Sequence, residues 1–311
     1  MPPLPSGRVD PDRASTFVIA ITPFTAAGHF DEAAVRGHLQ RMAAAGIGVY
    51  VGGGGSGEGY VLSDAEARRL LEISVEELHG AVPVRAMGVE PRTAGHMIEF
   101  IEMAADVGLD AVQIYSLDQG HGHRPTPDEI HRYFHDVLSA TTMPAVLSTH
   151  QSVGYKVPVA LLVELADRFD HLIGINCSHQ DLGYLSAMID AVGHRLEIHV
   201  GGPQHGLTAL SLGANGYLSS EGNLAPHLCV GVIDAYRNND AGRLADWYGK
   251  LLRLSMAFYG AGGIRATKAV LGALGLPGGS PRLPQLPVPP DRVPPLLEVI
   301  EDLGIGAIEG W

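Results

Sequence analysis

The sequence predicts a (β/α)8 TIM barrel with a C-terminal helical extension. Short β-rich apolar runs alternate with longer stretches of helical period, which favours a parallel sheet. Eight such strand–helix units can be traced along the 311 residues. A barrel of this kind needs roughly 250 residues, so one barrel and an extension account for the length. A doubly wound open sheet is the alternative, although such sheets commonly carry about six strands.

The strands are expected where apolar residues form short continuous runs, because strands buried on both faces lose the polar alternation. In chain order they are 17–23, 48–51, 82–89, 111–115, 145–148, 172–176, 197–200 and 216–219. The helices that follow them show the 3.6-residue period, and the second begins with a capping box of Ser63 and Glu66. In chain order they are 31–45, 63–78, 93–107, 126–139, 158–168, 182–191, 206–212 and 226–238.

The chain is expected to divide into three parts. Residues 1–15 contain several prolines and no apolar run, which is typical of a disordered arm. Residues 16–240 form the barrel. Residues 241–311 form a helical extension packed on the barrel, because this segment is too short for a core of its own. Within it, helices are expected at 241–259, 264–274 and 296–303, with a Pro-rich connector over 276–295.

Composition limits the possible partners and location. Hydrophobic residues make up 46% of the sequence, so a sizeable core is expected. The net charge is −13, so nucleic acid and anionic membranes are not expected as partners. The two cysteines are too few for a disulfide framework, which favours a reducing cytoplasmic compartment. Neither a signal peptide nor a transmembrane helix is expected.

The candidate site follows from the barrel, because active sites of such barrels lie at the carboxyl ends of the strands. The glycines after the second strand allow close approach of a ligand to the backbone, which suits a carboxylate or a phosphate. The turn lacks the Walker pattern, so a nucleotide site is not expected. Substrate-binding candidates are Thr22, Gly54, Gly55, Ser56, Gly57, Glu58 and Ser148. Catalytic candidates are Asp118, His150, Asn176 and His179.

Several segments, in order and in register with one barrel, resemble the dihydrodipicolinate synthase / N-acetylneuraminate lyase family. They are Ile21-Thr22-Pro23-Phe24 with Gly28 and Asp31, Gly54-Gly55-Ser56-Gly57-Glu58 with Val61-Leu62-Ser63, Ala104-Ala105-Asp106-Val107-Gly108-Leu109-Asp110-Ala111, Gly213-Ala214-Asn215-Gly216, Thr267-Lys268 and Arg282-Leu283-Pro284. The resemblance covers roughly residues 16 to 305. It implies a class I aldolase-type barrel that binds a 2-oxo acid as an imine on a lysine of the sixth strand, with a proton-shuttling tyrosine from the fifth.

The sequence departs from the family at these functional positions. Where the family has Gly-Ile-Lys, the chain reads Gly174-Ile175-Asn176. An amide nitrogen is not nucleophilic, so Asn176 cannot form the imine. The family's Tyr-Asn-x-Pro-x-Arg-Thr segment appears as residues 148–154, without the tyrosine or the arginine. Lysine occurs only at Lys156, Lys250 and Lys268. Schiff-base chemistry is therefore not expected, and the chain is interpreted as an atypical member that lacks the Schiff-base lysine.

Three functions remain open. In the first, His150 or His179 is a general acid or base, Asn176 donates to a developing oxyanion, and Ser56 with its turn holds a carboxylate. In the second, the barrel-mouth histidines bind a divalent metal that stabilises an enolate. In the third, the barrel is a non-catalytic binding or regulatory protein.

We therefore expect a lyase that performs aldol-type cleavage or addition, or a dehydration, on a small oxo or hydroxy carboxylate. No cofactor is expected, with a divalent metal as the open alternative. The resemblance further implies a homotetramer or a homodimer.

Overall fold

The computed structural model of the chain describes residues 10–311. Its residues group into two compact units. Unit 1 contains residues 10–15, Glu90–Ala105 and Ala111–Leu218, and unit 2 contains Thr16–Val89, Asp106–Asp110 and Ser219–Trp311.

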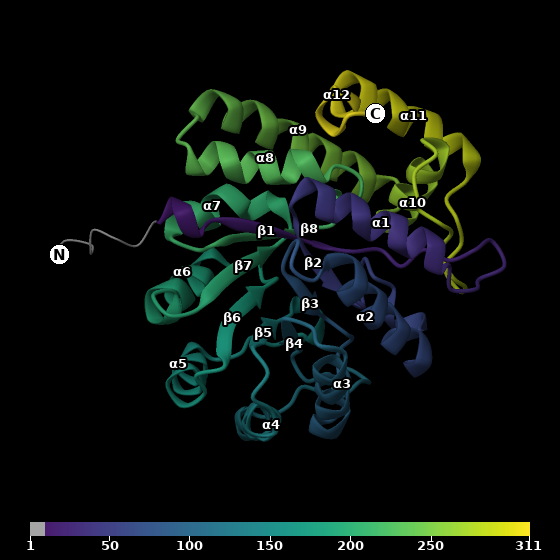
Figure 1. The fold of residues 1–311 in the computed structure, drawn as a ribbon. Helices are drawn as coiled ribbons and strands as arrows, with labels where there is room; N and C mark the ends of the chain where they lie inside the picture. The colour runs from purple at the N-terminus through teal and green to yellow at the C-terminus, as the bar shows by residue number, and fades with distance from the viewer. Residues whose placement is uncertain (1–9) are drawn as a thin grey trace. The chain divides into compact units, whose positions relative to one another are not determined.

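Eight parallel strands close into a barrel in chain order, which confirms the predicted fold class (Figure 1). All eight predicted strands are present, and the bounds differ from the expected ones by a few residues. The strands are β1 Ser15–Ile19, β2 Gly48–Val51, β3 Val84–Ala86, β4 Ala111–Ile114, β5 Ala145–Thr149, β6 Leu172–Cys177, β7 Glu197–Gly201 and β8 Gly216–Ser219. Almost every strand residue is buried, as expected for a sheet covered on both faces.

Each strand is followed by a helix of the predicted set. These helices are α1 Glu32–Ala45, α2 Asp64–Leu78, α3 Ala94–Val107, α4 Pro127–Ser139, α5 Val159–Arg168, α6 Leu182–Val192, α7 Gly206–Leu212 and α8 Pro226–Arg237. The predicted capping box of α2 is confirmed: the Ser63 side chain accepts from the Glu66 N–H, and the Glu66 carboxylate accepts from the Ser63 N–H. Thr126 and Glu129 form an equivalent box at the start of α4.

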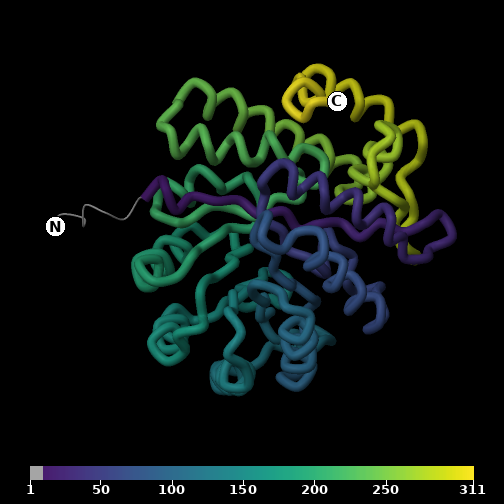
Figure 2. The backbone as a smooth tube through the Cα atoms, in the orientation of Figure 1, coloured from purple at the N-terminus to yellow at the C-terminus, as the bar shows by residue number. Residues whose placement is uncertain are grey.

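The C-terminal segment is helical, as predicted, and belongs to unit 2. It contains α9 Ala241–Gly260, α10 Ile264–Ala273, α11 Val293–Asp302 and a further short helix, α12 Ile305–Glu309. Helix α8 packs against α1 on one side and α9 on the other (Figure 2). Helices α8 and α9 pack against each other within unit 2.

Part of the segment expected as a disordered arm has regular structure. Pro11–Arg13 forms a 3-10 helix capped by Asp10, and Ser15 begins β1, where its N–H donates to the Asn215 carbonyl. The rest of that arm, residues 1–9, lies outside the described residues. Among residues 10–311, every helix is too short or too polar to cross a membrane.

Candidate active site

The glycine-rich turn that follows β2 is held in shape by its own backbone. The Gly59 N–H donates to the Gly53 carbonyl, and the Thr22 hydroxyl donates to the Gly57 carbonyl at 2.7 Å. A Cβ at Gly57 would lie 2.8 Å from the Gly53 backbone, and one at Gly59 would lie 2.1 Å from the Gly52 carbonyl oxygen. These glycines are therefore required for close packing within the turn.

Gly55 and Ser56 are the members of the turn that face a cavity. A Cβ at Gly55 would meet no atom within 4 Å. The cavity has a volume of about 230 Å3, is open to solvent, and lies entirely within unit 2. Its polar lining comes from the turn, from the end of β8 and from α9 and α10: Gly55, Ser56, Ser220, Glu221, Tyr259 and Thr267.

The polar groups at the end of β8 are fixed by hydrogen bonds. The Ser219 hydroxyl donates to Glu221 Oε2 at 2.7 Å. The Asn223 amide donates to the carbonyls of Ile19 and Ser220, both at 2.9 Å, and its Oδ1 accepts from the Ile21 N–H. Glu221 and Tyr259 are cavity residues that the sequence analysis did not select.

Glu58 and Thr22, two of the predicted substrate-binding residues, are fully buried and support the turn. Glu58 adopts a left-handed backbone conformation (φ 51°), and its carboxylate forms an ion pair with Lys268. Lys268 also donates to the carbonyls of Thr22 at 2.8 Å and Ser280 at 3.0 Å. Burial lowers the pKa of the Lys268 ammonium, and the Glu58 carboxylate opposes this shift. The pair therefore joins the turn to α10.

His150 lies directly after β5 in unit 1, in contact with a serine and a carboxylate. Its Nδ1 bonds to the Ser152 hydroxyl, which donates to Glu90 Oε1 at 3.2 Å. Nδ1 itself is 3.3 Å from the same Glu90 oxygen. Burial lowers the pKa of His150, and the Glu90 carboxylate opposes this shift. Since Nδ1 is engaged, Nε2 is the ring nitrogen that can exchange a proton with a bound molecule.

Asn176 and His179 come from β6 and the loop after it, next to β5 in the sheet. The Asn176 amide donates to Gln113 Oε1 at 2.6 Å. Asn176 Oδ1 and His179 Nε2 are buried and have no hydrogen-bond partner among the described residues. Burial lowers the pKa of His179, with smaller contributions in the same direction from Lys156 and His150. Buried polar atoms without partners are unusual in a folded protein and are satisfied when a polar ligand reaches them.

Asp118 lies in the loop after β4, and Ser148 lies near the carboxyl end of β5. Asp118 is paired with Arg92 (2.9 Å), and its Oδ1 accepts from the Gly120 N–H, so the carboxylate orders its own loop. The Ser148 carbonyl accepts from the buried Ser116 hydroxyl at 2.6 Å, and Ser116 in turn accepts from the His150 N–H at 3.3 Å. This chain of bonds fixes the backbone that presents His150.

The three lysines are engaged in ion pairs. Lys156 pairs with Asp181 in unit 1, and Lys250 pairs with Asp246 at 3.0 Å within α9. Lys268 is the buried partner of Glu58 described above. Asn176 occupies the sixth strand, where the resemblance implies the imine-forming lysine.

His131, His135 and Glu164 form the one group of three or more possible metal ligands within the described part of the chain. His150 and His179 do not belong to it. Two of the predicted catalytic residues contact other polar side chains. His150 contacts Ser152 and Glu90, and Asn176 donates a hydrogen bond to Gln113. Glu90 and Ser152 were not selected from the sequence, although Glu90 follows the third strand and Ser152 lies two residues after His150.

A closed parallel barrel with polar residues at its strand ends defines an enzyme-type (β/α)8 barrel. The chain belongs to the dihydrodipicolinate synthetase family, whose model matches residues 12–302. This membership supports an aldolase-type lyase that acts on small carboxylates.

Relatives at modest identity span almost the whole chain. The 4-hydroxy-tetrahydrodipicolinate synthase of Methanopyrus kandleri is 28% identical over 91% of this chain and 90% of its own length. The 4-hydroxy-tetrahydrodipicolinate synthase 1 of Streptomyces coelicolor is 29% identical over 85% of each chain. Among solved structures, the dihydrodipicolinate synthase of Thermotoga maritima has a TM-score of 0.85 at 18% identity, covering 94% of this chain and 99% of its own. An E. coli K12 prophage protein of the dihydrodipicolinic acid synthase family, in complex with pyruvate, has a TM-score of 0.84 at 23% identity over 94% and 99%.

Proposed function

We propose that this protein is a lyase that cleaves or forms a carbon–carbon bond in a small oxo or hydroxy carboxylate without a lysine imine. The observation that carries the proposal is the hydrogen-bonded set His150, Ser152 and Glu90. Asn176 provides a second argument, because the residue on the sixth strand is an amide. No cofactor is part of the proposed reaction.

His150 acts as the general base in this proposal. For a 2-oxo-4-hydroxy acid, Nε2 takes the proton of the 4-hydroxyl, and the bond between C3 and C4 breaks. The electron pair moves onto the 2-oxo oxygen, which becomes an enolate, and C4 leaves as an aldehyde. Return of the proton to C3 releases a 2-oxo acid. Burial lowers the pKa of His150, which favours the neutral imidazole that can accept this proton.

Asn176 and His179 are proposed to receive the polar atoms of the substrate. Asn176 Nδ2 uses one hydrogen for Gln113, and the other can donate to the enolate oxygen. Asn176 Oδ1 gains a partner when a substrate hydroxyl donates to it, and His179 Nε2 gains one from a substrate hydroxyl or carboxylate. Within unit 2, the turn at Gly54–Gly57, with Ser56 on the cavity of that unit, is proposed to bind a carboxylate group in that cavity.

The test is release of 2-oxo acid from a panel of 2-oxo-4-hydroxy acids. We expect His150→Ala to lower kcat/KM by roughly 10²- to 10⁴-fold, the usual contribution of a positioned acid or base. His194→Ala is the matched control, because His194 is exposed and precedes β7. The activity of this variant should equal that of the wild type. Equal activity of wild type and His150→Ala would refute the assigned role.

Glu90 is a positioning residue, and its test is the pH profile. The Glu90 carboxylate opposes the lowering of the His150 pKa, so Glu90→Gln should move the acidic limb of kcat/KM to lower pH. A role of Glu90 confined to folding would leave the acidic limb in place.

Incubation of the protein with pyruvate and borohydride tests for a lysine imine. It should leave no covalent adduct, and a trapped adduct would contradict an imine-free reaction. Saturable carboxylate binding without any turnover would instead support the binding-protein alternative.

A further inference from the structure

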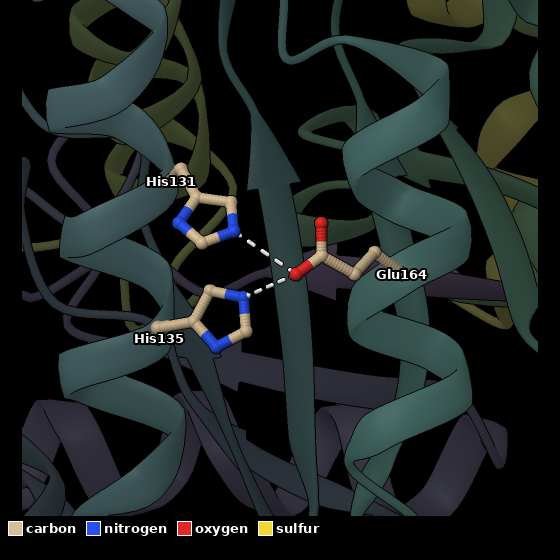
Figure 3. A group of neighbouring side chains, drawn as sticks. All are labelled: His131, His135 and Glu164. Atoms are coloured by element: carbon tan, nitrogen blue, oxygen red, sulfur yellow. Dashed lines mark hydrogen bonds and ion pairs between the residues drawn. The ribbon is translucent and has the colours of Figure 1, made fainter.

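Two outer helices of unit 1 bring together three metal-ligand side chains that the proposed reaction does not use. His131 and His135 lie four residues apart on α4, so they share one face of that helix. Glu164 lies on α5, which packs against α4. Figure 3 shows both imidazoles directed at the same carboxylate oxygen. The distances from His131 Nε2 and His135 Nε2 to Glu164 Oε1 are 2.9 and 2.8 Å.

The ring positions are fixed by packing before any ligand binds. The side chain of His135 is only 11% exposed and lies beside Phe169, with 5.6 Å between ring centroids. The His131 ring lies 4.2 Å from the His135 ring. The His131 and Glu164 side chains are about half exposed, so water and ions can reach the group.

We propose that His131, His135 and Glu164 form a site for a divalent transition metal such as Zn2+, which joins α4 to α5. Two imidazole nitrogens and a carboxylate oxygen are ligands that this class of metal prefers. All the candidate ligand atoms lie within 4.8 Å of one another. In a tetrahedral zinc site with bonds of roughly 2.0–2.2 Å, neighbouring ligand atoms are about 3.3 Å apart. Small side-chain rotations therefore convert the hydrogen-bonded group into a metal site.

The metal takes the place of the two hydrogens that the imidazoles now donate from Nε2 to Glu164. Each imidazole shifts its proton from Nε2 to Nδ1 through water, remains neutral, and donates the Nε2 lone pair to the ion. The carboxylate supplies one negative charge, and water completes the coordination. The site is distinct from the proposed catalytic set, which contains His150 and His179, so it can be tested without a known substrate.

The experiment uses the full-length untagged protein, freed of metal with a chelator that is then removed. Zn2+ affinity is measured by competition with a chromophoric chelator, and Co2+ is added to detect tetrahedral coordination by visible absorption. We expect one equivalent of Zn2+ and an increase in Tm of roughly 5 °C when free Zn2+ is about 100 times its Kd. Loss of one ligand, in His131→Gln or in the isosteric Glu164→Gln, should weaken binding by more than about 10-fold.

Two matched controls carry a single imidazole beside a carboxylate. His79 Nδ1 lies 3.7 Å from Asp110, and His227 Nδ1 lies 3.0 Å from Glu309. His79→Gln and His227→Gln should bind Zn2+ as the wild type does. The variant His150→Ala/His179→Ala should also bind one equivalent of Zn2+, as the wild type does.

Three results would overturn the proposal: no stoichiometric binding to the wild type, unchanged affinity in both His131→Gln and Glu164→Gln, or loss of metal only in the His150→Ala/His179→Ala variant. The last result would instead indicate a metal at the proposed catalytic residues.

Discussion

At the scale of single residues, buried polar groups determine the geometry around the cavity of unit 2. The side chains of Glu58 and Lys268 are both inaccessible to solvent and form an ion pair. The backbone carbonyls of Thr22 and Ser280 accept further hydrogen bonds from the Lys268 ammonium. A buried pair of this kind contributes little compared with apolar packing, but removal of one partner leaves an uncompensated charge. The shape of the glycine-rich turn therefore depends on a side chain far away in the sequence.

Glu58→Gln should destabilise the protein by about 3–5 kcal/mol, because the Lys268 ammonium would lose its buried counter-charge. The measurement is the urea midpoint of unfolding. Asp246→Asn is the control, since it removes an exposed partner of Lys250 and should change stability by at most about 0.5 kcal/mol. Glu58→Leu/Lys268→Met should recover much of the loss. A double variant as unstable as Glu58→Gln would argue against a charge effect.

At the scale of elements, the hydrogen-bonded caps define where the helices begin. Two capping boxes, Ser63 with Glu66 and Thr126 with Glu129, satisfy N–H groups at the first turns of α2 and α4. Helix α4 follows the long loop after β4 and carries the two histidines of the proposed metal site. Its start therefore also sets the position of these ligands.

Thr126→Ala should lower the stability of the protein by about 1 kcal/mol, the usual contribution of a threonine cap. Ser63→Ala provides the comparison, because it removes the same type of cap from α2. Zinc affinity should stay unchanged in both variants if α4 keeps its helical turns. Chemical denaturation gives the stability, and a stability equal to that of the wild type would show that the Thr126 cap contributes nothing.

The elements could be predicted because their signals are local. Each strand is a short apolar run, and each helix has a clear period, so all eight strands and their helices were expected at nearly their observed positions. The short helix Ile305–Glu309 was not expected, because its five residues are too few to show a period.

The candidate site was less predictable, because its contacts join residues that are distant in sequence. The strand-end rule selects His150 and Asn176. Their partners, Glu90 in the loop after β3 and Gln113 on β4, become apparent only in three dimensions. The same holds for Glu58, whose partner Lys268 is 210 residues away. The histidine pair of α4 did have a sequence signal, the four-residue spacing on a predicted helix. Its third ligand, Glu164, did not.

At the scale of the whole molecule, several large apolar side chains of unit 2 remain exposed. Met256 and Tyr259 of α9 are 67% and 60% exposed, and Leu283 and Leu286 of the Pro-rich connector are 71% and 61% exposed. Exposed apolar side chains mark an interaction surface where they form a contiguous patch. We propose a homo-oligomer, a tetramer or a dimer, in which these residues are covered.

Light scattering of the purified protein should therefore give the mass of a dimer or tetramer of the 32.8 kDa chain. Met256→Glu together with Leu286→Glu should shift the protein toward smaller species, because each substitution introduces a charge into an apolar contact. Arg253→Glu is a control for the added negative charge on the same helix. A monomeric wild type would contradict the proposal.

The open space beside Gly55 makes this turn suitable for directed evolution. Its neighbours Gly53, Gly57 and Gly59 are packed so tightly that added side chains would meet other atoms, whereas a side chain at Gly55 would extend into the cavity. Randomising that single codon would thus vary the chemistry of the cavity wall while the backbone of the turn stays the same. A small library could search for new substrate preferences at little risk to folding.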